Sequence, residues 1–199
     1  RVPTPAAISF TKSWVKPEPK GSVLIISPWN YPIMLCLNPL IAAIAAGNTA
    51  IIKPSELTPE SGKVLQELIK RTFSENEVSV ILGEKSVAEK LLTLPFNHIL
   101  FTGSPKIGKI VMRAAAKHLS GVTLELGGKS PTVVDSSANI KEAAWKIAFF
   151  KFANAGQTCT APDYILCEES VHDKLVNELN KNIIHFFGGN IQIGSKDYC

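Results

Sequence analysis

A single cysteine, Cys159, stands among small and polar residues in the stretch NAGQTCTAPDYIL, residues 154 to 166. Gly156, Gln157 and Thr158 precede it and predict a turn that exposes the sulfur near a helix N-terminus, an environment that favours the thiolate. A free thiol is only a few per cent ionised at pH 7, so a nucleophilic cysteine needs such surroundings. The chemistry would be covalent catalysis. A small structural residue at the start of a strand is the alternative that a lone cysteine leaves open.

A second candidate is Glu125, an acid between two leucines in LELGGK. The run before it is typical of a buried strand, and a buried carboxyl group is suited to accept a proton near neutral pH. A carboxylate capped by neighbouring backbone donors is an equally good interpretation of this residue taken alone.

Short apolar runs rich in β-branched residues predict buried strands: SVLIIS, NTAIIK, VSVILG, HILFTG and VTLELG. Amphipathic segments separate them, the clearest at 58–72 and 104–118. This alternation predicts an α/β fold with an open, mainly parallel five-stranded Rossmann-like sheet, right-handed crossovers and flanking helices. Such sheets bind ligands at the carboxyl ends of their strands, which would gather Asn30, Lys53, Gly83, Gly103 and Glu125 to Gly128.

The elements suggest three regions. Residues 1–21 carry prolines around AISFTKSWV and predict an extended arm or bridging hairpin outside the core. Residues 22–128 hold the predicted sheet. Residues 129–199 are expected to form the truncated N-terminal part of a second α/β domain, in which a helix at 139–153, a strand at 163–168 and a helix at 170–187 follow PTVVD.

Two segments look like phosphate loops and fail the test for a nucleoside triphosphatase. GSPKIGKI, residues 103 to 110, has Ile110 where a hydroxyl must bind magnesium, and GGKS, residues 127 to 130, has Thr123 at the upstream glycine position. The dinucleotide fingerprint GxGxxG is also missing.

What FTGSPKIG does supply is a strand end, a glycine, the Ser104 hydroxyl and a helix N-terminus, which together can hold a pyrophosphate. Ser104 as a plain helix cap is the simpler interpretation. Lys53 and Glu56 in IIKPSE either hold ribose hydroxyls or form a solvated pair.

Composition excludes several classes of protein. The 21 basic and 17 acidic side chains leave a net charge of +4, spread along the chain, which argues against a nucleic-acid partner. The stretch from Ile33 to Ile52 is interrupted by polar residues and glycine, so it predicts a buried helix and turn rather than a membrane span. The histidines have no motif partners. The cysteines are Cys36, Cys159, Cys167 and Cys199. They form no CxxC pair, which argues against a zinc site and disulfides and favours a reducing, intracellular setting. Cys36 and Cys167 stand among apolar residues and are expected to be core thiols.

Taken together, the motifs SPWNYP, GNTAIIKPSE, FTGSPKIGK, VTLELGGKSP and NAGQTCTAPDYIL resemble the NAD(P)-dependent aldehyde dehydrogenases. APDYIL is similar to the class 3 or fatty-aldehyde branch, and the match runs from about Val2 to Tyr198. The resemblance implies an oxidoreductase that converts an aldehyde to a carboxylic acid through a cysteine thiohemiacetal and thioester, with NAD, or alternatively NADP, and without a metal. The family's later glutamate before FGP is not in this sequence, so we expect a fragment that lacks the substrate tunnel and is itself inactive.

The same resemblance assigns roles to residues. Cys159 would be the nucleophile, Glu125 the general base and Asn30 the amide donor to the oxyanion. Lys53 and Glu56 would hold the adenosine ribose, with Glu56 disfavouring a 2'-phosphate and so favouring NAD. The remaining cofactor-binding residues would be Ser27, Trp29, Gly83, Gly103, Ser104, Ile107, Gly108, Leu126 and Gly127. Pro105 departs from the small residue common in the family.

The resemblance also implies partners and leaves rival functions. We expect a small-molecule aldehyde substrate, a homodimer bridged by residues 1–21, and a cytoplasmic location. One rival is a CoA- or phosphate-dependent acylating reductase, against which Glu125 argues because a water-activating base is less useful there. The other is an inactive nucleotide-binding module.

Overall fold

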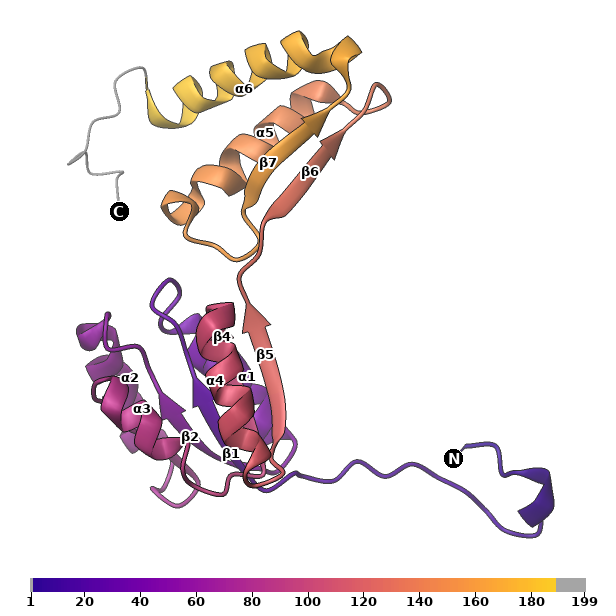
Figure 1. Ribbon diagram of the computed structural model, residues 1–199, viewed down its shortest axis with the longest axis vertical. Helices are drawn as coiled ribbons and strands as arrows, with labels where there is room; N and C mark the ends of the chain where they lie inside the picture. Colours follow the sequence, from indigo (N-terminus) through magenta and orange to yellow (C-terminus); the bar gives the residue numbers. More distant parts are fainter. Residues whose placement is uncertain (1, 189–199) are drawn as a thin grey trace. The chain divides into compact units, whose positions relative to one another are not determined.

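The computed structural model describes residues 2–188, and the chain divides into two compact units, Arg1–Glu125 and Leu126–Cys199. In the first unit a five-stranded sheet has the order β3-β2-β1-β4-β5 (Figure 1). Its strands are β1 Ser22–Ile26, β2 Thr49–Lys53, β3 Val78–Val80, β4 His98–Gly103 and β5 Gly121–Leu126. β1 pairs in parallel with both β2 and β4, and β2 pairs in parallel with β3. The predicted fold class is therefore confirmed.

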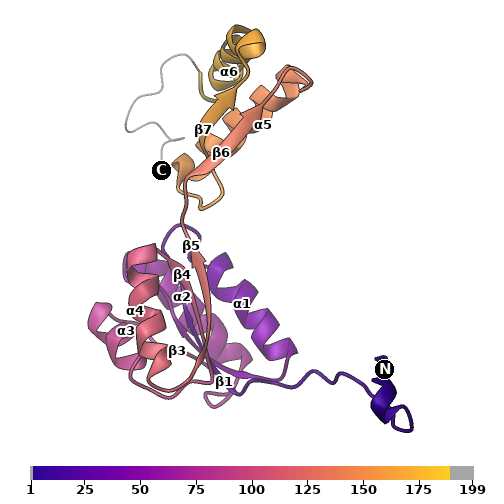
Figure 2. The ribbon, with the colours of Figure 1, turned by 45° about the vertical axis from the view of Figure 1, so that its right-hand side comes forward.

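Helices connect successive strands of this sheet. They are α1 Met34–Ala45, α2 Pro59–Thr72, α3 Lys85–Leu91 and α4 Pro105–Ala116, and α1 and α4 lie on opposite faces (Figure 2). The core beneath α1 and α2 joins Leu40 and Leu65 to strand residues that all point to one face: Val23, Ile25, Ala50, Ile52, Val78 and Val80. These alternate positions of adjacent strands form one continuous apolar surface, which the two helices bury.

Local chemistry explains where the two clearest helices begin. α2 starts with Pro59, which lacks an amide hydrogen, and an amide in the first turn of a helix would have no intrahelical acceptor in any case. Its last turn carries Lys70 and Arg71, whose positive charges interact favourably with the negative end of the helix dipole. α4 starts after Ser104, whose hydroxyl caps it, and has Pro105 at its first position. Both helices match the segments expected from amphipathicity.

One expectation about the sheet is wrong. The central strands β1 and β2 are largely buried, but β5 is only half-buried along its length and Glu125 is exposed. The reason is position, because β5 lies at the edge of the sheet, where one flank has no neighbouring strand.

The second unit is a parallel β–α–β arrangement with one more helix. β6 Ser130–Val134 pairs in parallel with β7 Pro162–Cys167, and α5 Ile140–Phe152 connects them. Short 3-10 segments, Ala153–Gly156 and Glu169–Val171, precede β7 and α6 His172–Phe187. Asn139 caps α5 by accepting a hydrogen bond from the Glu142 amide at 3.4 Å. Val134, Ala144, Ile147 and Leu175 belong to the core that holds α5, α6 and the strands together.

Residues before β1 form an exposed arm. It contains a 3-10 turn at Ala6–Ile8 and an antiparallel bridge between Val2 and Ser13, as a hairpin would. Among the described residues no helix has the length and apolarity needed to cross a membrane. Cys36 is buried in the core as expected, and Cys167 is half-buried against the second core; Cys199 lies outside the described residues.

Candidate active site

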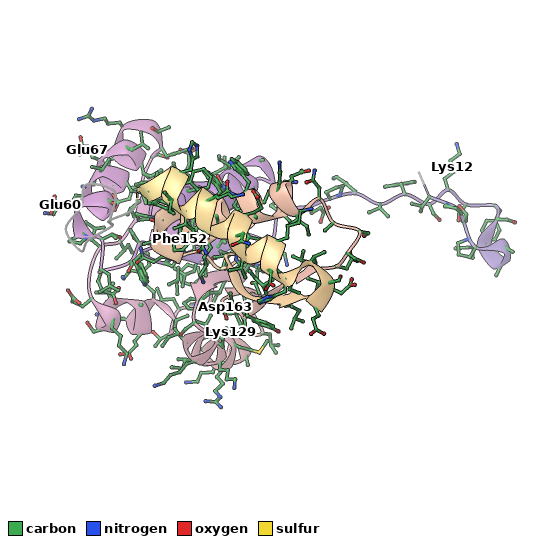
Figure 3. The ribbon with its side chains drawn as sticks, turned by 90° about the horizontal axis from the view of Figure 1, so that it is seen from above. Lys12, Glu60, Glu67, Lys129, Phe152 and Asp163 are labelled. Carbon is green, nitrogen blue, oxygen red and sulfur yellow. The ribbon has the colours of Figure 1, made fainter. Side chains whose placement is uncertain are left out.

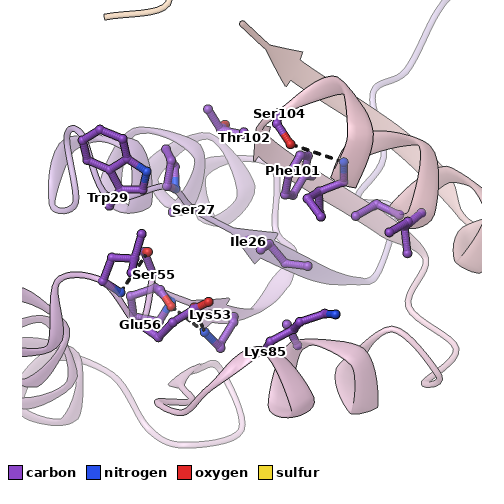
Figure 4. A pocket seen from close by; sticks show the side chains of 18 of the residues that line it. Ile26, Ser27, Trp29, Lys53, Ser55, Glu56, Lys85, Phe101, Thr102 and Ser104 are labelled. Atoms are coloured by element: carbon purple, nitrogen blue, oxygen red, sulfur yellow. Dashed lines mark hydrogen bonds and ion pairs between the residues drawn. The ribbon is translucent and has the colours of Figure 1, made fainter. Parts of the chain in front are cut away.

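A pocket of about 340 Å³ opens in the first unit at the carboxyl ends of β1, β2 and β4 (Figure 4). The strand order reverses between β1 and β4, since the chain runs outward to β3 and then returns to the other side of β1. A crevice at such a switch point is the usual ligand site of open α/β sheets. Seven of the residues predicted to bind a cofactor line it: Ser27, Trp29, Lys53, Glu56, Gly103, Ser104 and Ile107.

Lys53, at the end of β2, is the most unusual side chain in this pocket, because only 2% of its surface is exposed. Its ammonium donates to the Pro54 carbonyl at 2.8 Å and to a Glu56 carboxylate oxygen at 3.2 Å. Burial alone would raise the pKa of Glu56, but a backbone amide, the hydrogen bond from Lys53 and its charge hold that pKa below its usual value. Lys53 and Glu56 are therefore not a solvated pair, because Lys53 is buried. Their paired charges present fixed polar groups to the pocket.

The start of α4 forms the opposite side of the pocket. The Ser104 hydroxyl accepts a hydrogen bond from the Ile107 amide at 3.4 Å, and the Ser104 carbonyl accepts one from Gly108 at 2.9 Å. A Cβ atom at Gly103 would lie 2.5 Å from the ring of Phe101, so only glycine allows this approach. The N-terminus of α4, as the positive end of the helix dipole, is suited to an anionic group.

Two residues after β1 complete this pocket. Ser27 is buried, and its hydroxyl donates to the Leu35 carbonyl at 2.9 Å, which ties the loop to α1. Trp29 is 43% exposed and lends an indole surface to the pocket wall. Burial raises the pKa of the nearby Cys36 thiol, although a hydrogen bond with Ser27 opposes that effect.

The pocket also has lining residues that the sequence did not reveal. Apolar and charged side chains of α3, of the residue after it and of α4 also line the pocket: Lys85, Ala88, Glu89, Leu92, Ile110 and Val111. For Ile110 and Val111, the apolar stripe of α4 was the feature of the sequence that could have indicated a place in the pocket. Gly83 and Gly108 are not among the lining residues, nor are Asn30 and Glu125. Leu126 and Gly127 belong to the second unit.

Cys159 lies in the second unit, exposed on the turn between α5 and β7. The Ser130 hydroxyl donates to the Cys159 carbonyl at 3.5 Å, so the start of β6 supports the turn. Cys159 is followed by the strand β7 and not by a helix. The helix N-terminus expected beside the sulfur is therefore not supplied by the segment that comes after Cys159.

The backbone before Cys159 is strained. Asn154, Ala155 and Gly156 are successive left-handed residues with φ of 51°, 53° and 74°. A left-handed conformation costs roughly 1–2 kcal/mol for an ordinary residue such as alanine, whereas glycine adopts it freely and asparagine tolerates it. Strain of this kind persists only where surrounding contacts impose it, and it is frequent at functional sites.

The other two predicted catalytic residues belong to the first unit. Asn30 is half-buried in the loop after β1, and Glu125 is exposed near the end of β5. The expectation that burial tunes Glu125 is therefore wrong for this structure. No cluster of metal-ligating side chains occurs in residues 2–188.

Comparison with known proteins identifies the class to which this sheet, pocket and cysteine turn belong. The model of the aldehyde dehydrogenase family matches residues 4–192. This chain belongs to the aldehyde dehydrogenase family, whose members use NAD or NADP.

Particular relatives lie close in sequence and fold. The chain is 56% identical over 197 residues to the 4,4'-diaponeurosporen-aldehyde dehydrogenase of Staphylococcus aureus, covering 99% of this chain and 43% of that protein. It is 47% identical over 191 residues to mouse aldehyde dehydrogenase family 3 member B2, covering 96% and 40%. The substrate-bound structure of Staphylococcus aureus AldH superposes with a TM-score of 0.92 at 55% identity, covering 99% of this chain and 43% of that one. The chain thus spans less than half the length of these relatives.

Proposed function

We propose that the full-length protein oxidises an aldehyde to a carboxylic acid with NAD or NADP, through a thiohemiacetal and then a thioester on Cys159. The observation that carries this proposal is the exposed Cys159 on a strained, supported turn in a chain of this family. The switch-point pocket supports it, because a buried Lys53–Glu56 pair and a helix N-terminus are suited to ribose hydroxyls and a pyrophosphate.

The first steps use the thiolate of Cys159. Its sulfur attacks the carbonyl carbon, a C–S bond forms, and the electron pair of the carbonyl moves to oxygen. The Asn30 amide and the Cys159 backbone N–H would donate hydrogen bonds to that oxyanion. Loss of one such donor typically costs about 3 kcal/mol in the barrier. The bound nicotinamide supplies a hydride acceptor, and hydride loss from the substrate leaves an acyl thioester on Cys159.

Hydrolysis then releases the product. Glu125 would take a proton from water, the hydroxide would attack the thioester carbon, and the C–S bond would break to regenerate the thiolate. Exposure of Glu125 in this structure keeps its carboxylate within reach of solvent water, which suits this role.

The experiment compares cysteine variants of the full-length protein. Cys159→Ala should abolish aldehyde-dependent NADH formation, by at least about a thousandfold, while nucleotide still binds. Cys167→Ala, at the half-buried cysteine of the same unit, is the matched control and should keep more than half of the activity. Substantial dehydrogenase activity in Cys159→Ala would refute the proposal.

A second variant separates oxidation from acyl transfer. Glu125→Gln should preserve the burst of NADH and slow the steady-state release of acid. Product analysis with and without added CoA checks the acceptor, since formation of acyl-CoA in place of acid would support the acylating alternative.

Cofactor choice, assembly and location complete the proposal. Glu56 next to Lys53 should disfavour a 2'-phosphate, so we propose a modest NAD preference, measured as the ratio of kcat/KM with NAD and NADP.

Exposed apolar side chains on the arm, Phe10, Trp14 and Val15, support a homodimer, which light scattering tests. The free cysteines among the described residues support a reducing, cytoplasmic location.

A further inference from the structure

The strained turn before Cys159 has internal hydrogen bonds that do not anchor its ends. The amides of Gln157, Thr158 and Ala161 donate to carbonyls within the turn, at 3.1, 2.8 and 3.1 Å. Each of these bonds links residues two or three positions apart. These three bonds do not themselves set where the turn lies relative to the strands, so contacts to other segments bear on its location, among them the bond from the Ser130 hydroxyl to the Cys159 carbonyl.

One carboxylate contacts every segment that borders this turn. Asp163, the second residue of β7, lies 3.0 Å from the ammonium of Lys129, which directly precedes β6. Its other oxygen lies 3.9 Å from the ammonium of Lys151, in the last turn of α5. Figure 3 shows Asp163 and Lys129 close together, with Phe152 marking the end of α5.

The surroundings of Asp163 favour a geometric role. The side chain of Asp163 is 31% exposed, that of Lys151 is 39% exposed and that of Lys129 is 81% exposed, so only the Asp163–Lys151 pair is partly shielded from solvent. Ion pairs of this exposure contribute little to overall stability, but a carboxylate shared by two lysines restricts where the connected backbone segments can lie. Ser130, adjacent to Lys129, also holds the Cys159 carbonyl, so the same corner of the unit supports the cysteine itself.

We propose that Asp163 is a positioning residue for Cys159, which fixes the strained cysteine turn by joining the end of α5 and the start of β6 to β7. This inference rests on the proposed function only for its catalytic consequence. The placement of the turn is a property of the unit itself.

The experiment uses the full-length protein with three variants. Asp163→Asn keeps the shape and removes the charge, and Asp163→Glu restores a carboxylate. Asp173→Asn is the control, at a 98% exposed aspartate whose hydrogen-bond partner is its neighbour His172. Hydrogen exchange of the amides of 157, 158 and 161 reports the turn, and kcat, KM and nucleotide affinity report catalysis.

In Asp163→Asn we expect the turn amides to exchange at least about tenfold faster, while amides in the middle of α5 are unchanged. kcat should fall about tenfold, because a displaced nucleophile loses its attack geometry, and nucleotide affinity should stay within twofold. Asp163→Glu should recover at least half of kcat, and Asp173→Asn should match the wild type.

Two results would overturn the inference: unchanged turn exchange in Asp163→Asn, or faster exchange throughout the unit that Asp163→Glu does not reverse. If Asp163→Asn does not fold, Lys129→Gln and Lys151→Gln each remove one of its two contacts, and wild-type turn exchange in both would be equally decisive. Failure of the proposed function looks different, because the wild type would then lack aldehyde oxidation while the exchange effect of Asp163→Asn remained.

Discussion

At the scale of single residues, type and spacing predict candidate side chains for the chemistry, and the structure adds the environment of each. Lys53 was recognisable after a strand, yet its burial depends on the Pro54 carbonyl and on Glu56 folding back toward it. Glu125 was expected to be buried because its neighbours are leucines, and the edge position of β5 exposes it instead. Asn154 and Gly156 are residues that tolerate left-handed backbone, but Ala155 gave no such signal, so the strain of the cysteine turn was not predictable.

Gly103 offers a residue-level test of the pocket. Gly103→Ala would place a Cβ atom 2.5 Å from the Phe101 ring, which is itself buried and lines the pocket, so the ring or the loop must move. We expect NAD affinity to weaken about tenfold, measured by calorimetry on the full-length protein. Met112→Ala is the control, at a 56% exposed residue of α4 that does not line the pocket. Equal affinities for the two variants would contradict this account of the loop.

At the scale of elements, the short apolar runs were sufficient to place the five strands of the sheet, because parallel strands covered by helices on both faces must be apolar. Strand order was not predictable from the runs, since each run only shows that a strand exists. The order of the strands in the sheet decides which carboxyl ends lie next to one another. The pocket forms where β1 and β4 are neighbours, although more than 70 residues separate them in the chain.

The contact between β4 and the edge strand β5 should depend on pH. The His98 ring bonds the Thr123 hydroxyl at 2.9 Å through Nε2, and its buried Nδ1 has no hydrogen-bond partner within residues 2–188. Burial, and then the charge of Lys20, lower the pKa of His98 from its ordinary 6.5. The folded state therefore binds fewer protons than the unfolded state, so stability present above pH 6.5 is lost as pH falls below it.

We expect urea unfolding to show this loss between pH 7.5 and 5.5. The side chain is partly accessible and screened by solvent, so the effect should not exceed about 1 kcal/mol. His98→Gln should flatten this part of the pH dependence, whereas His118→Gln, at an exposed histidine, should retain it. A pH dependence unchanged by His98→Gln would show that other groups cause it.

At the scale of the whole molecule, the sequence motifs predict nucleotide binding and nucleophilic chemistry in different regions. The residues that line the switch-point pocket and Cys159 belong to different compact units. Every residue that lines the switch-point pocket lies between Ile26 and Val111, within the first unit. No contact with the second unit is needed to form this pocket. Nucleotide binding should thus be separable from turnover, which requires Cys159.

Tryptophan fluorescence can test this separation in the 199-residue chain. Trp29 is the only one of the three tryptophans that lines the pocket; Trp14 lies on the arm and Trp145 on α5. NAD and AMP should both quench the emission, because an adenine or ribose beside the exposed indole changes its environment. Trp29→Phe should remove the optical signal while calorimetry still detects binding. Lys53→Met should weaken binding itself, since it removes the buried cation that lines the pocket. Folded protein that gives neither quenching nor heat with NAD would mean that the first unit alone does not form the nucleotide site.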